Sequence, residues 1–226
     1  MIDDCIDSSN CKFDASDCIL NDEAIREALS RDKAGSGLDY ESGQKVFKMG
    51  KKVVGFYVVC QGIIKEFTYQ NGENITLSVF KHGDLLTGGA FFRETEWHQT
   101  TAESITQSRV IFLSRELLPR LMKVAGDTIG GKLAQNIKGL RRRLGLVSCS
   151  VLENTAFWLV RLLPDSANSF TMSNKELASI VGCSPVTMSR KLSKLAGENL
   201  IEKNGQEIRI PEKDELRNVA PGVELT

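Results

Sequence analysis

The stretch TMSNKELASIVGCSPVTMSRKLSKLAGENLIEKNGQEIRI, residues 171–210, decides the fold, because it carries the signals of two helices and a hairpin in that order. Ser173 and Glu176 form a capping box, in which the serine hydroxyl accepts from the Glu176 amide and the glutamate carboxylate accepts from the Ser173 amide. Gly182 suits the left-handed position that ends a helix. The first helix is therefore expected over residues 175–181.

A second helix is expected over residues 186–197, directly after this turn. Ser184 offers a capping hydroxyl, and Pro185 stands at the first helical position, where a missing amide hydrogen costs nothing. Apolar residues at spacings of four and three predict the buried face, and they are Met188, Leu192 and Leu195. The outward side would then carry Pro185, Val186, Ser189 and Arg190.

Two short β-prone runs, Leu200-Ile201 and residues 208–210, flank Asn204-Gly205. Asn-Gly suits a two-residue hairpin turn with positive φ, so this segment is expected to form a wing. The three signals together predict a winged helix-turn-helix.

Residues 171–210 resemble the DNA-binding end of the CRP/FNR superfamily of bacterial transcription regulators, above all in the run IVGCS, in the T-x-S-R element and in the Leu-Ile pair before the wing. The resemblance extends over residues 40–212. It implies a homodimer that binds an inverted repeat of double-stranded DNA and works with RNA polymerase. The DNA contacts are expected from Ser184, Val186, Thr187, Ser189, Arg190 and Lys191.

Arg190 is the strongest candidate for reading sequence, because a guanidinium can donate two hydrogen bonds to O6 and N7 of guanine. Its alternative role is a phosphate contact, the role also expected of Thr187 and Lys191. Many family members have a glutamate, which accepts from a cytosine amine, where this chain has Val186. Because valine can only pack against a thymine methyl, we expect half-sites resembling TTGAT but changed at that base pair; a spacer role for Val186 is the alternative.

Length and composition fit two modest domains, since 226 residues with 41% hydrophobic content can bury two cores. The acidic first residues lack the features of a signal peptide and no apolar run has membrane-spanning length, so a cytoplasmic protein without a membrane partner is expected.

The formal net charge is zero, but Arg190, Lys191 and Lys194 cluster on the second helix, with Lys203 and Arg209 on the wing.

The segment between Lys45 and Phe112 contains short β-prone runs separated by glycines at 50, 62, 72 and 83. Such regular spacing predicts a small sandwich or barrel, with a further hairpin signal at Asn71-Gly72 and a common face for Ile75, Leu77 and Val79. The runs VCQGIIKEF and FKHGDLLTGGAFF resemble the β-roll sensor domain of the same superfamily. Before it, a short helix is expected over residues 21–31 and a loop over 33–43.

The resemblance also bears on the effector. Cyclic AMP-binding members hold the ribose with a glutamate and the phosphate with an arginine, and these positions fall on Gly88 and His98. A buried cyclic phosphate without its arginine lacks charge compensation, so cyclic AMP is not expected to be the effector. An organic effector would instead lie beside Thr87, Gly88, Gly89, His98 and Gln99.

After Phe112 the pattern becomes helical, with a short helix over residues 115–124 and a longer one from Asp127. Apolar residues at spacings of four and three predict a coiled-coil dimer seam made of Leu133, Ile137, Leu140, Leu144 and Val147. The alternative is a single helix packed on its own β-domain. A capping box at Ser150 and Glu153 opens a further helix over residues 151–163, and residues 164–169 are expected to form a loop.

Six cysteines occur at positions 5, 11, 18, 60, 149 and 183. The first three invite comparison with the oxygen-sensing branch of the family, whose iron–sulfur cluster needs four thiolates. Their spacing is wider than that branch requires, and its fourth cysteine falls on Ile111. The possible set of metal ligands is therefore Cys5, Cys11, Cys18 and Cys60; thiol–disulfide switching, haem bound by His82 or His98, and a core role for Cys60 remain open.

The expected fold is α+β, with a cyclic-nucleotide-binding-like β-roll, a long dimerisation helix and a winged helix-turn-helix. The boundaries are a cysteine-containing leader over residues 1–20, the sensor over 21–125, the helix over 126–149 and the DNA-binding domain over 150–226. No nucleophile–base pair or phosphate loop points to an enzyme. The competing hypothesis is a redox or metal-binding protein whose helix-turn-helix binds another protein.

Overall fold

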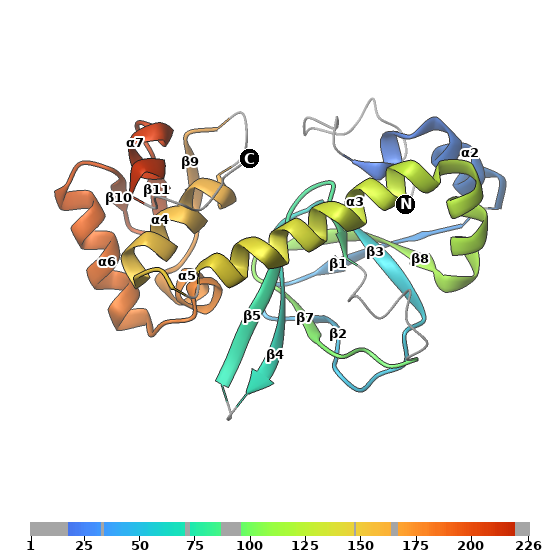
Figure 1. Ribbon diagram of the computed structural model, residues 1–226, viewed down its shortest axis with the longest axis horizontal. Coiled ribbons are helices and arrows are strands. Elements are labelled where there is room, and N and C mark those ends of the chain that lie inside the picture. Colours follow the sequence, from blue (N-terminus) through green and yellow to red (C-terminus); the bar gives the residue numbers. More distant parts are fainter. Residues whose placement is uncertain are drawn as a thin grey trace. The chain divides into compact units, whose positions relative to one another are not determined.

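A computed structural model describes residues 18–32, 34–70, 73–86, 96–146, 148–163 and 167–219 (Figure 1). The chain forms two compact units. The first comprises residues 1–69 and 77–139, and the second comprises residues 70–76 and 140–226. Within the described part no helix is long and apolar enough to cross a membrane.

The first unit is a β-roll of two antiparallel four-stranded sheets, as the sequence predicts. One sheet has the order β1-β8-β3-β6, with β1 over Ser36–Tyr40, β8 over Ser108–Ser114, β3 over Gly55–Gln61 and β6 over Leu85–Leu86. The other has the order β2-β7-β4-β5, with β2 over Lys45–Phe47, β7 over Thr101–Ser104, β4 over Ile64–Gln70 and β5 over Glu73–Phe80.

Glycines at 50, 62 and 83 all have positive φ, which explains why the turns between the strands recur at these positions. Asn71-Gly72 lies outside the described residues. On β5, Ile75 is exposed and Leu77 and Val79 are half-buried. The loop expected over residues 33–43 is wrong, because β1 lies inside it and pairs with β8 from Ser36 opposite Phe112 to Tyr40 opposite Ser108.

Two clusters of buried side chains form the core of this unit. One contains residues from both sheets, among them Phe47, Tyr57, Ile64 and Ala102, so it lies between them. The other joins β3 and β8 to helical segments through Phe56, Ile111, Leu113, Leu29 and Ile129. The roll is therefore packed on both faces of the β1-β8-β3-β6 sheet.

The first helical region begins slightly differently from the expectation. A 3-10 turn, η1, covers Ile19–Asn21, and α2 covers Glu23–Asp32. Asp22 precedes α2 and accepts hydrogen bonds from the amides of Ala24 and Ile25, as a capping side chain does. Its other carboxylate oxygen accepts from Thr128 at 2.6 Å, and this bond is the main cause of the lowered pKa of Asp22.

A 3-10 turn, η3 over Arg115–Leu117, leads into the long helix α3 over Leu118–Leu146 (Figure 1). Ala125 interrupts α3 with φ of −146° and ψ of 40°. The interruption falls between the two helices that the sequence predicts, so the change in hydrophobic pattern near this residue corresponds to a real break in the helix.

The second unit contains α4 over Val151–Leu162, α5 over Asn174–Val181, α6 over Pro185–Gly197 and α7 over Lys213–Asn218. A three-stranded sheet has the order β10-β11-β9, with β10 over Glu202–Asn204, β11 over Glu207–Arg209 and β9 over Ser169–Thr171. The expectation of a loop ending at Ser169 missed β9, and no sequence signal was assigned to α7.

The turn of the wing lies one residue later in the sequence than expected. Asn204 pairs with Glu207, so the turn consists of Gly205 and Gln206 rather than Asn204 and Gly205. Gly205 has φ of +59° and Gln206 has no positive φ, which is the pattern of a turn with glycine at its first central position. Ile201 lies before β10 and is buried, as are Ile208 and Ile210.

Candidate nucleic-acid interface and sensor interior

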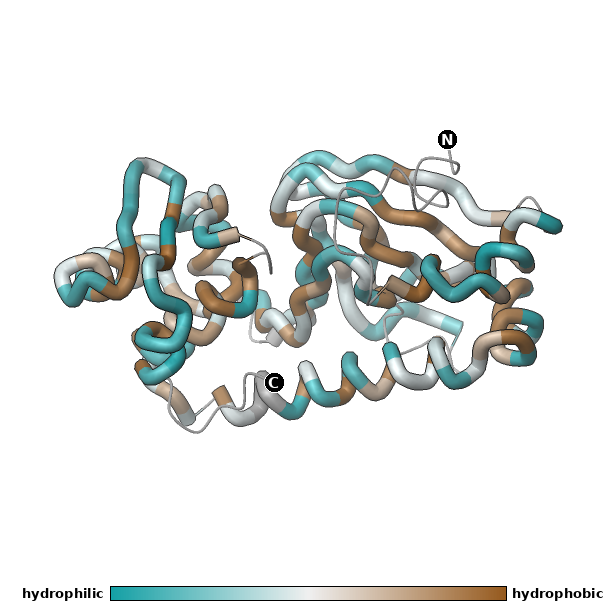
Figure 2. Tube along the Cα trace, turned by 90° about the horizontal axis from the view of Figure 1, so that it is seen from above, coloured by the Kyte–Doolittle hydropathy of each residue, from teal (hydrophilic) through white to brown (hydrophobic). Residues whose placement is uncertain are grey.

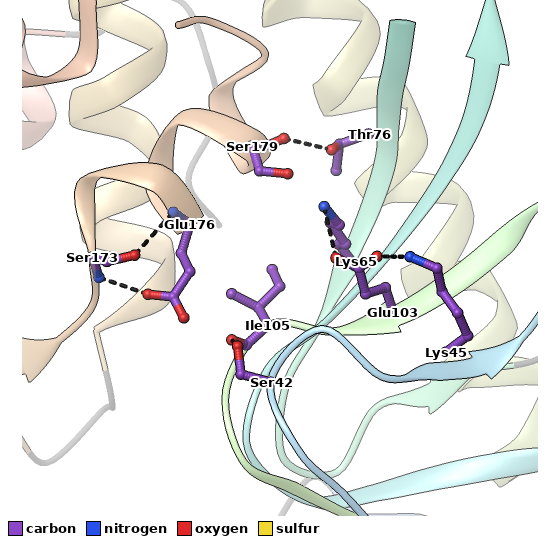
Figure 3. A network of polar contacts seen from close by, with 9 residues as sticks. All are labelled: Ser42, Lys45, Lys65, Thr76, Glu103, Ile105, Ser173, Glu176 and Ser179. Carbon is purple, nitrogen blue, oxygen red and sulfur yellow. Dashed lines mark hydrogen bonds and ion pairs between the residues drawn. The ribbon is translucent and has the colours of Figure 1, made fainter. Parts of the chain in front are cut away.

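The pair α5–α6 is built from the local signals that its sequence carries. The Glu176 amide donates to Ser173 Oγ at 3.2 Å, and the Ser173 amide donates to Glu176 Oε2 at 2.6 Å (Figure 3). Gly182 ends α5 with φ of +81°. Ser184 Oγ then accepts from the Thr187 amide at 3.1 Å and begins α6. Both capping predictions are confirmed.

The two sides of α6 differ sharply in burial. Met188, Leu192 and Leu195 are fully buried, as their spacing predicts. Val186 is 62% exposed, and Ser189 and Arg190 are exposed one turn further along the helix. Because residues three and four apart share a helix face, these three side chains form one outward surface, which we call the α6 face.

The basic side chains of this unit differ in whether they already form ion pairs or hydrogen bonds within it. Arg209 Nη1 forms an ion pair with Glu202 at 3.1 Å, Lys203 donates to the carbonyl oxygen of Gly205 and Lys194 lies 3.8 Å from Glu198. Arg190 and Lys191 form no ion pair with any described residue. The guanidinium of Arg190 is therefore an exposed charge of the α6 face without an ion-pair partner among the described residues. Ser184 and Thr187 bond to each other through their hydroxyls at 2.9 Å.

Of the five residues predicted to surround an organic effector, the structure describes His98 and Gln99. Thr87, Gly88 and Gly89 lie outside the described residues. His98 is 3% exposed, and its ring stacks on Phe47 with centroids 3.9 Å apart. Gln99 is exposed and donates to the carbonyl oxygen of Trp97. Of the described members, only His98 lies in the interior.

Sequence reasoning missed two polar residues inside the roll, Glu66 and Thr100. Glu66 is 8% exposed, and its carboxylate accepts from the Thr100 hydroxyl. Burial raises the pKa of Glu66, and the hydrogen bond from Thr100 opposes that rise. Strict alternation along Ile64 to Phe67 would have placed Glu66 on the same face as the core residue Ile64. The alternation of side chains along this strand therefore predicts the inward position of Glu66.

The opposite face of the same sheet carries a charged cluster (Figure 3). Lys45 and Lys65 both form ion pairs with Glu103, and Lys65 is buried with its Nζ 3.2 Å from a Glu103 oxygen. Both ammonium groups also lie over the ring of Phe67, at 5.3 and 5.0 Å from its centroid. The ion pairs and the ring compensate the lysine charges, so this cluster is structural.

Comparison with known families agrees with both units. Residues 38–124 match the cyclic nucleotide-binding domain, and residues 155–219 match the Crp-like helix-turn-helix domain. The chain belongs to the CRP/FNR superfamily. It is a transcription regulator of the CRP/FNR type, with the α+β fold that the sequence predicts.

Relatives in this superfamily cover most of the chain. The Cyclic AMP receptor protein of Thermus thermophilus is 26% identical over 190 residues, covering 81% of this chain and 88% of that protein. The Fumarate and nitrate reduction regulatory protein of Vibrio cholerae is 25% identical, covering 95% and 93%. The fold is shared with FixK2 from Bradyrhizobium japonicum, with a TM-score of 0.72 at 17% identity over 84% of this chain and 99% of that one.

Helix α3, where the sequence predicts the dimer seam, has apolar residues interspersed with polar ones (Figure 2). Ile137 is 53% exposed and Leu140 is 42% exposed, whereas Leu133 packs against the core of the roll. The side chain of Leu144 and all of Val147 lie outside the described residues. Two of the described seam residues are therefore available to a partner.

The cysteines of this CRP/FNR protein divide by environment. Cys5 and Cys11 lie outside the described residues. Cys60 is buried among the residues of one core cluster, against which Cys18 packs, and its thiol donates weakly to the carbonyl oxygen of Val58. Among described residues no group of three metal-binding side chains is present. The burial of Cys60 is that of a core thiol. His82 Nδ1 lies 2.7 Å from the carbonyl oxygen of Cys60.

Proposed function

We propose that this protein is a dimeric CRP/FNR regulator that binds an inverted-repeat operator through the α6 face. The observation that carries the proposal is the pairing of a fully buried side, Met188, Leu192 and Leu195, with an outward Arg190 that has no ion-pair partner among the described residues. A cation held in this way is free to enter the major groove. RNA polymerase is the expected protein partner, as the family resemblance implies.

Arg190→Ala tests the proposal directly. If the guanidinium reads guanine, the variant should lose affinity for the selected operator by about 1–3 kcal/mol and lose discrimination at one base pair. Arg217→Ala is the matched control, because Arg217 is an exposed cation of the same unit whose charge is paired with Asp214. Operator affinities would be measured by fluorescence anisotropy on wild-type and single-base-changed sites.

Three results are informative. A sequence-selective loss in Arg190→Ala alone supports base reading. An equal loss on all sequences assigns Arg190 to phosphate and leaves DNA binding standing. No loss at all, together with no palindrome in a binding-site selection, contradicts the proposal and favours a protein-binding role for the helix-turn-helix.

Val186 is proposed to set one base pair of the half-site. Its isopropyl group is 62% exposed on the α6 face, so it can pack against a thymine methyl but cannot accept a hydrogen bond. A selection with the wild type should return half-sites that differ from TTGAT at one position, and Val186→Glu should change that preference towards a cytosine on the contacted strand. An unchanged TTGAT-type site for the wild type would contradict this role.

We propose that cyclic AMP is not the effector, although several relatives carry that nucleotide in their names. Burial lowers the pKa of His98, so its imidazole is neutral near pH 7 and offers no charge to a cyclic phosphate. Its stacking on Phe47 also fixes the ring. Tight cyclic AMP binding in a calorimetric titration would contradict this proposal.

We propose the leader thiols Cys5, Cys11 and Cys18 as candidate ligands of an iron–sulfur cluster, which needs a fourth thiolate, with Cys60 as the candidate for it in the sensor domain. The cysteine side chains would bind the iron atoms of the cluster as deprotonated thiolates. Anaerobic purification followed by an absorption spectrum and assays of iron and sulfide distinguishes a cluster from haem and from a colourless ligand. Cys60→Ser should leave any cluster in place if Cys60 is a core thiol.

A further inference from the structure

The inner face of the β2-β7-β4-β5 sheet carries a carboxyl group where the neighbouring positions are apolar. Phe47 pairs with Ala102, and Ala102 pairs with Glu66, so these three residues form one row across β2, β7 and β4. Side chains directly opposite each other in a sheet point to the same face. Because Phe47 and Ala102 belong to the core between the sheets, Glu66 also points into the roll.

The carboxyl group of Glu66 is poorly compensated there. An ionised carboxylate has about four acceptor sites. The Thr100 hydroxyl is its hydrogen-bond donor, and none of the described lysine, arginine or histidine residues forms an ion pair with it. Burial raises the pKa of Glu66, as expected for a carboxyl group that has lost its hydration.

The imidazole of His98 is a second unsatisfied polar group beside this row. His98 is 3% exposed and stacks on Phe47, and its Nδ1 atom has no hydrogen-bond partner among the described residues. One residue separates His98 from Thr100, whose hydroxyl donates to Glu66. The ring of Tyr57 also faces Phe47, with centroids 6.0 Å apart. A group bound in the interior can supply the partner that this buried atom lacks.

From this arrangement we infer that the interior of the roll binds a small organic cation, an amidine or a primary amine, which donates hydrogen bonds to the carboxylate of Glu66. The stacked rings of Phe47, Tyr57 and His98 add apolar contact surface for the carbon part of the same occupant. An anionic ligand would place like charges together in a buried site, which is strongly unfavourable. The inference rests on the proposed function of the chain as a regulator, in which the first unit is the sensor expected from the family resemblance.

Three probes of nearly equal shape and different charge test it: benzamidine, benzamide and benzoate. Each would be titrated into the full-length protein carrying labelled isoleucine methyl groups. The Ile64 methyl is the reporter, because Ile64 shares the inner face with Glu66 two positions away. The Ile208 methyl, buried in the second unit, is the internal control.

The expected result is a saturable shift at Ile64 with benzamidine, a weaker response with benzamide, no response with benzoate and no shift at Ile208. Glu66→Gln keeps an acceptor for the Thr100 hydroxyl. It should lower the affinity for benzamidine by about tenfold or more, because one charge-assisted hydrogen bond is lost. Glu103→Gln, on the opposite face of the sheet, should leave benzamidine affinity unchanged.

The inference is overturned if benzoate binds as well as benzamidine, if none of the probes shifts Ile64, or if Glu66→Gln leaves the benzamidine affinity unchanged. A shift that persists in Glu66→Gln with its full affinity assigns the site to the aromatic rings alone. These titrations contain no DNA, and the Arg190 measurements contain no probe, so the two proposals can fail separately.

Discussion

Glu66 is a charged residue on the inner face of a β-roll, and its cost to the fold depends on pH. Burial raises its pKa above the ordinary value of 4.5, so the folded protein holds this proton more tightly than the unfolded chain does. The group therefore favours the folded state most at low pH. Its contribution is lost as the pH rises from about 4.5 through the raised pKa.

Glu66→Gln should remove this dependence. Below pH 4.5 the variant and the wild type should be equally stable within error, and above the raised pKa the variant should be more stable by about 1.4 kcal/mol for each unit of the shift. Urea unfolding at a series of pH values measures the difference. Equal stability at neutral pH would mean that the carboxylate is compensated in the folded state.

At the scale of single elements, turns and caps fix where strands and helices begin. Gly62 has φ of +84°, and a Cβ atom built on it would collide with Ser108 Oγ and with the carbonyl oxygen of Gln107. Gly50 has φ of +76°, but no heavy atom lies within 4 Å of the position of its missing Cβ. Both turns therefore favour glycine for its positive φ, and the turn at Gly62 also has no room for a Cβ atom.

Gly62→Ala should destabilise the protein by at least about 3 kcal/mol, because it adds a backbone collision to the conformational penalty. Gly50→Ala should cost only the conformational penalty of about 1–2 kcal/mol. Thermal and urea unfolding of the two variants gives the comparison. Equal losses would show that the chain around Gln107 moves to accept the methyl group.

The elements with strong local signals could be predicted, and those fixed by pairing could not. Ser173, Gly182 and Ser184 set the ends of α5 and α6 through bonds to their own neighbours, so their positions follow from the sequence. β1 and β9 are short edge segments that become strands by pairing with β8 and β11, and their own residues carry little periodicity. The wing turn lies between these cases, because Asn204-Gly205 predicts the hairpin but pairing places Gly205 first in the turn.

The candidate functional residues also differ in whether the sequence alone predicts their positions. The outward position of Arg190 follows from the spacing of Met188, Leu192 and Leu195 on one helix. The polar interior of the roll depends instead on which strands lie side by side. Glu66 and Phe47 are far apart in the sequence and meet in one row only because both β2 and β4 pair with β7.

At the scale of the whole molecule, the proposed mechanism needs two copies. An operator with twofold symmetry requires two recognition helices about one DNA turn apart, which one chain cannot supply. An effector then acts by favouring the arrangement of the two copies that binds DNA, and it can shift this equilibrium only by its difference in affinity for the two arrangements. In the proposed mechanism, regulation therefore depends on dimerisation, for which α3 is the predicted surface.

Ile137 and Leu140 are three residues apart on α3 and exposed, so they share one outward face. Because each side chain is about half buried already, its burial against a partner contributes about 0.7–1.5 kcal/mol. Ile137→Glu should replace that gain with the cost of a buried charge in both copies, and the dimer dissociation constant should rise by at least about 100-fold. Gln135→Glu adds the same charge at an exposed position outside the predicted seam and is the matched control.

Sedimentation velocity over a range of concentrations measures both variants. Ile137→Glu should sediment as a monomer where the wild type and Gln135→Glu sediment as dimers, and it should bind a palindromic operator no better than a single half-site. Its unfolding midpoint at low concentration should match that of the monomeric wild type, because Ile137 is already half in solvent there. If Ile137→Glu and Gln135→Glu remain equally dimeric, the copies associate through another surface, and the recognition helices must be spaced by that surface instead.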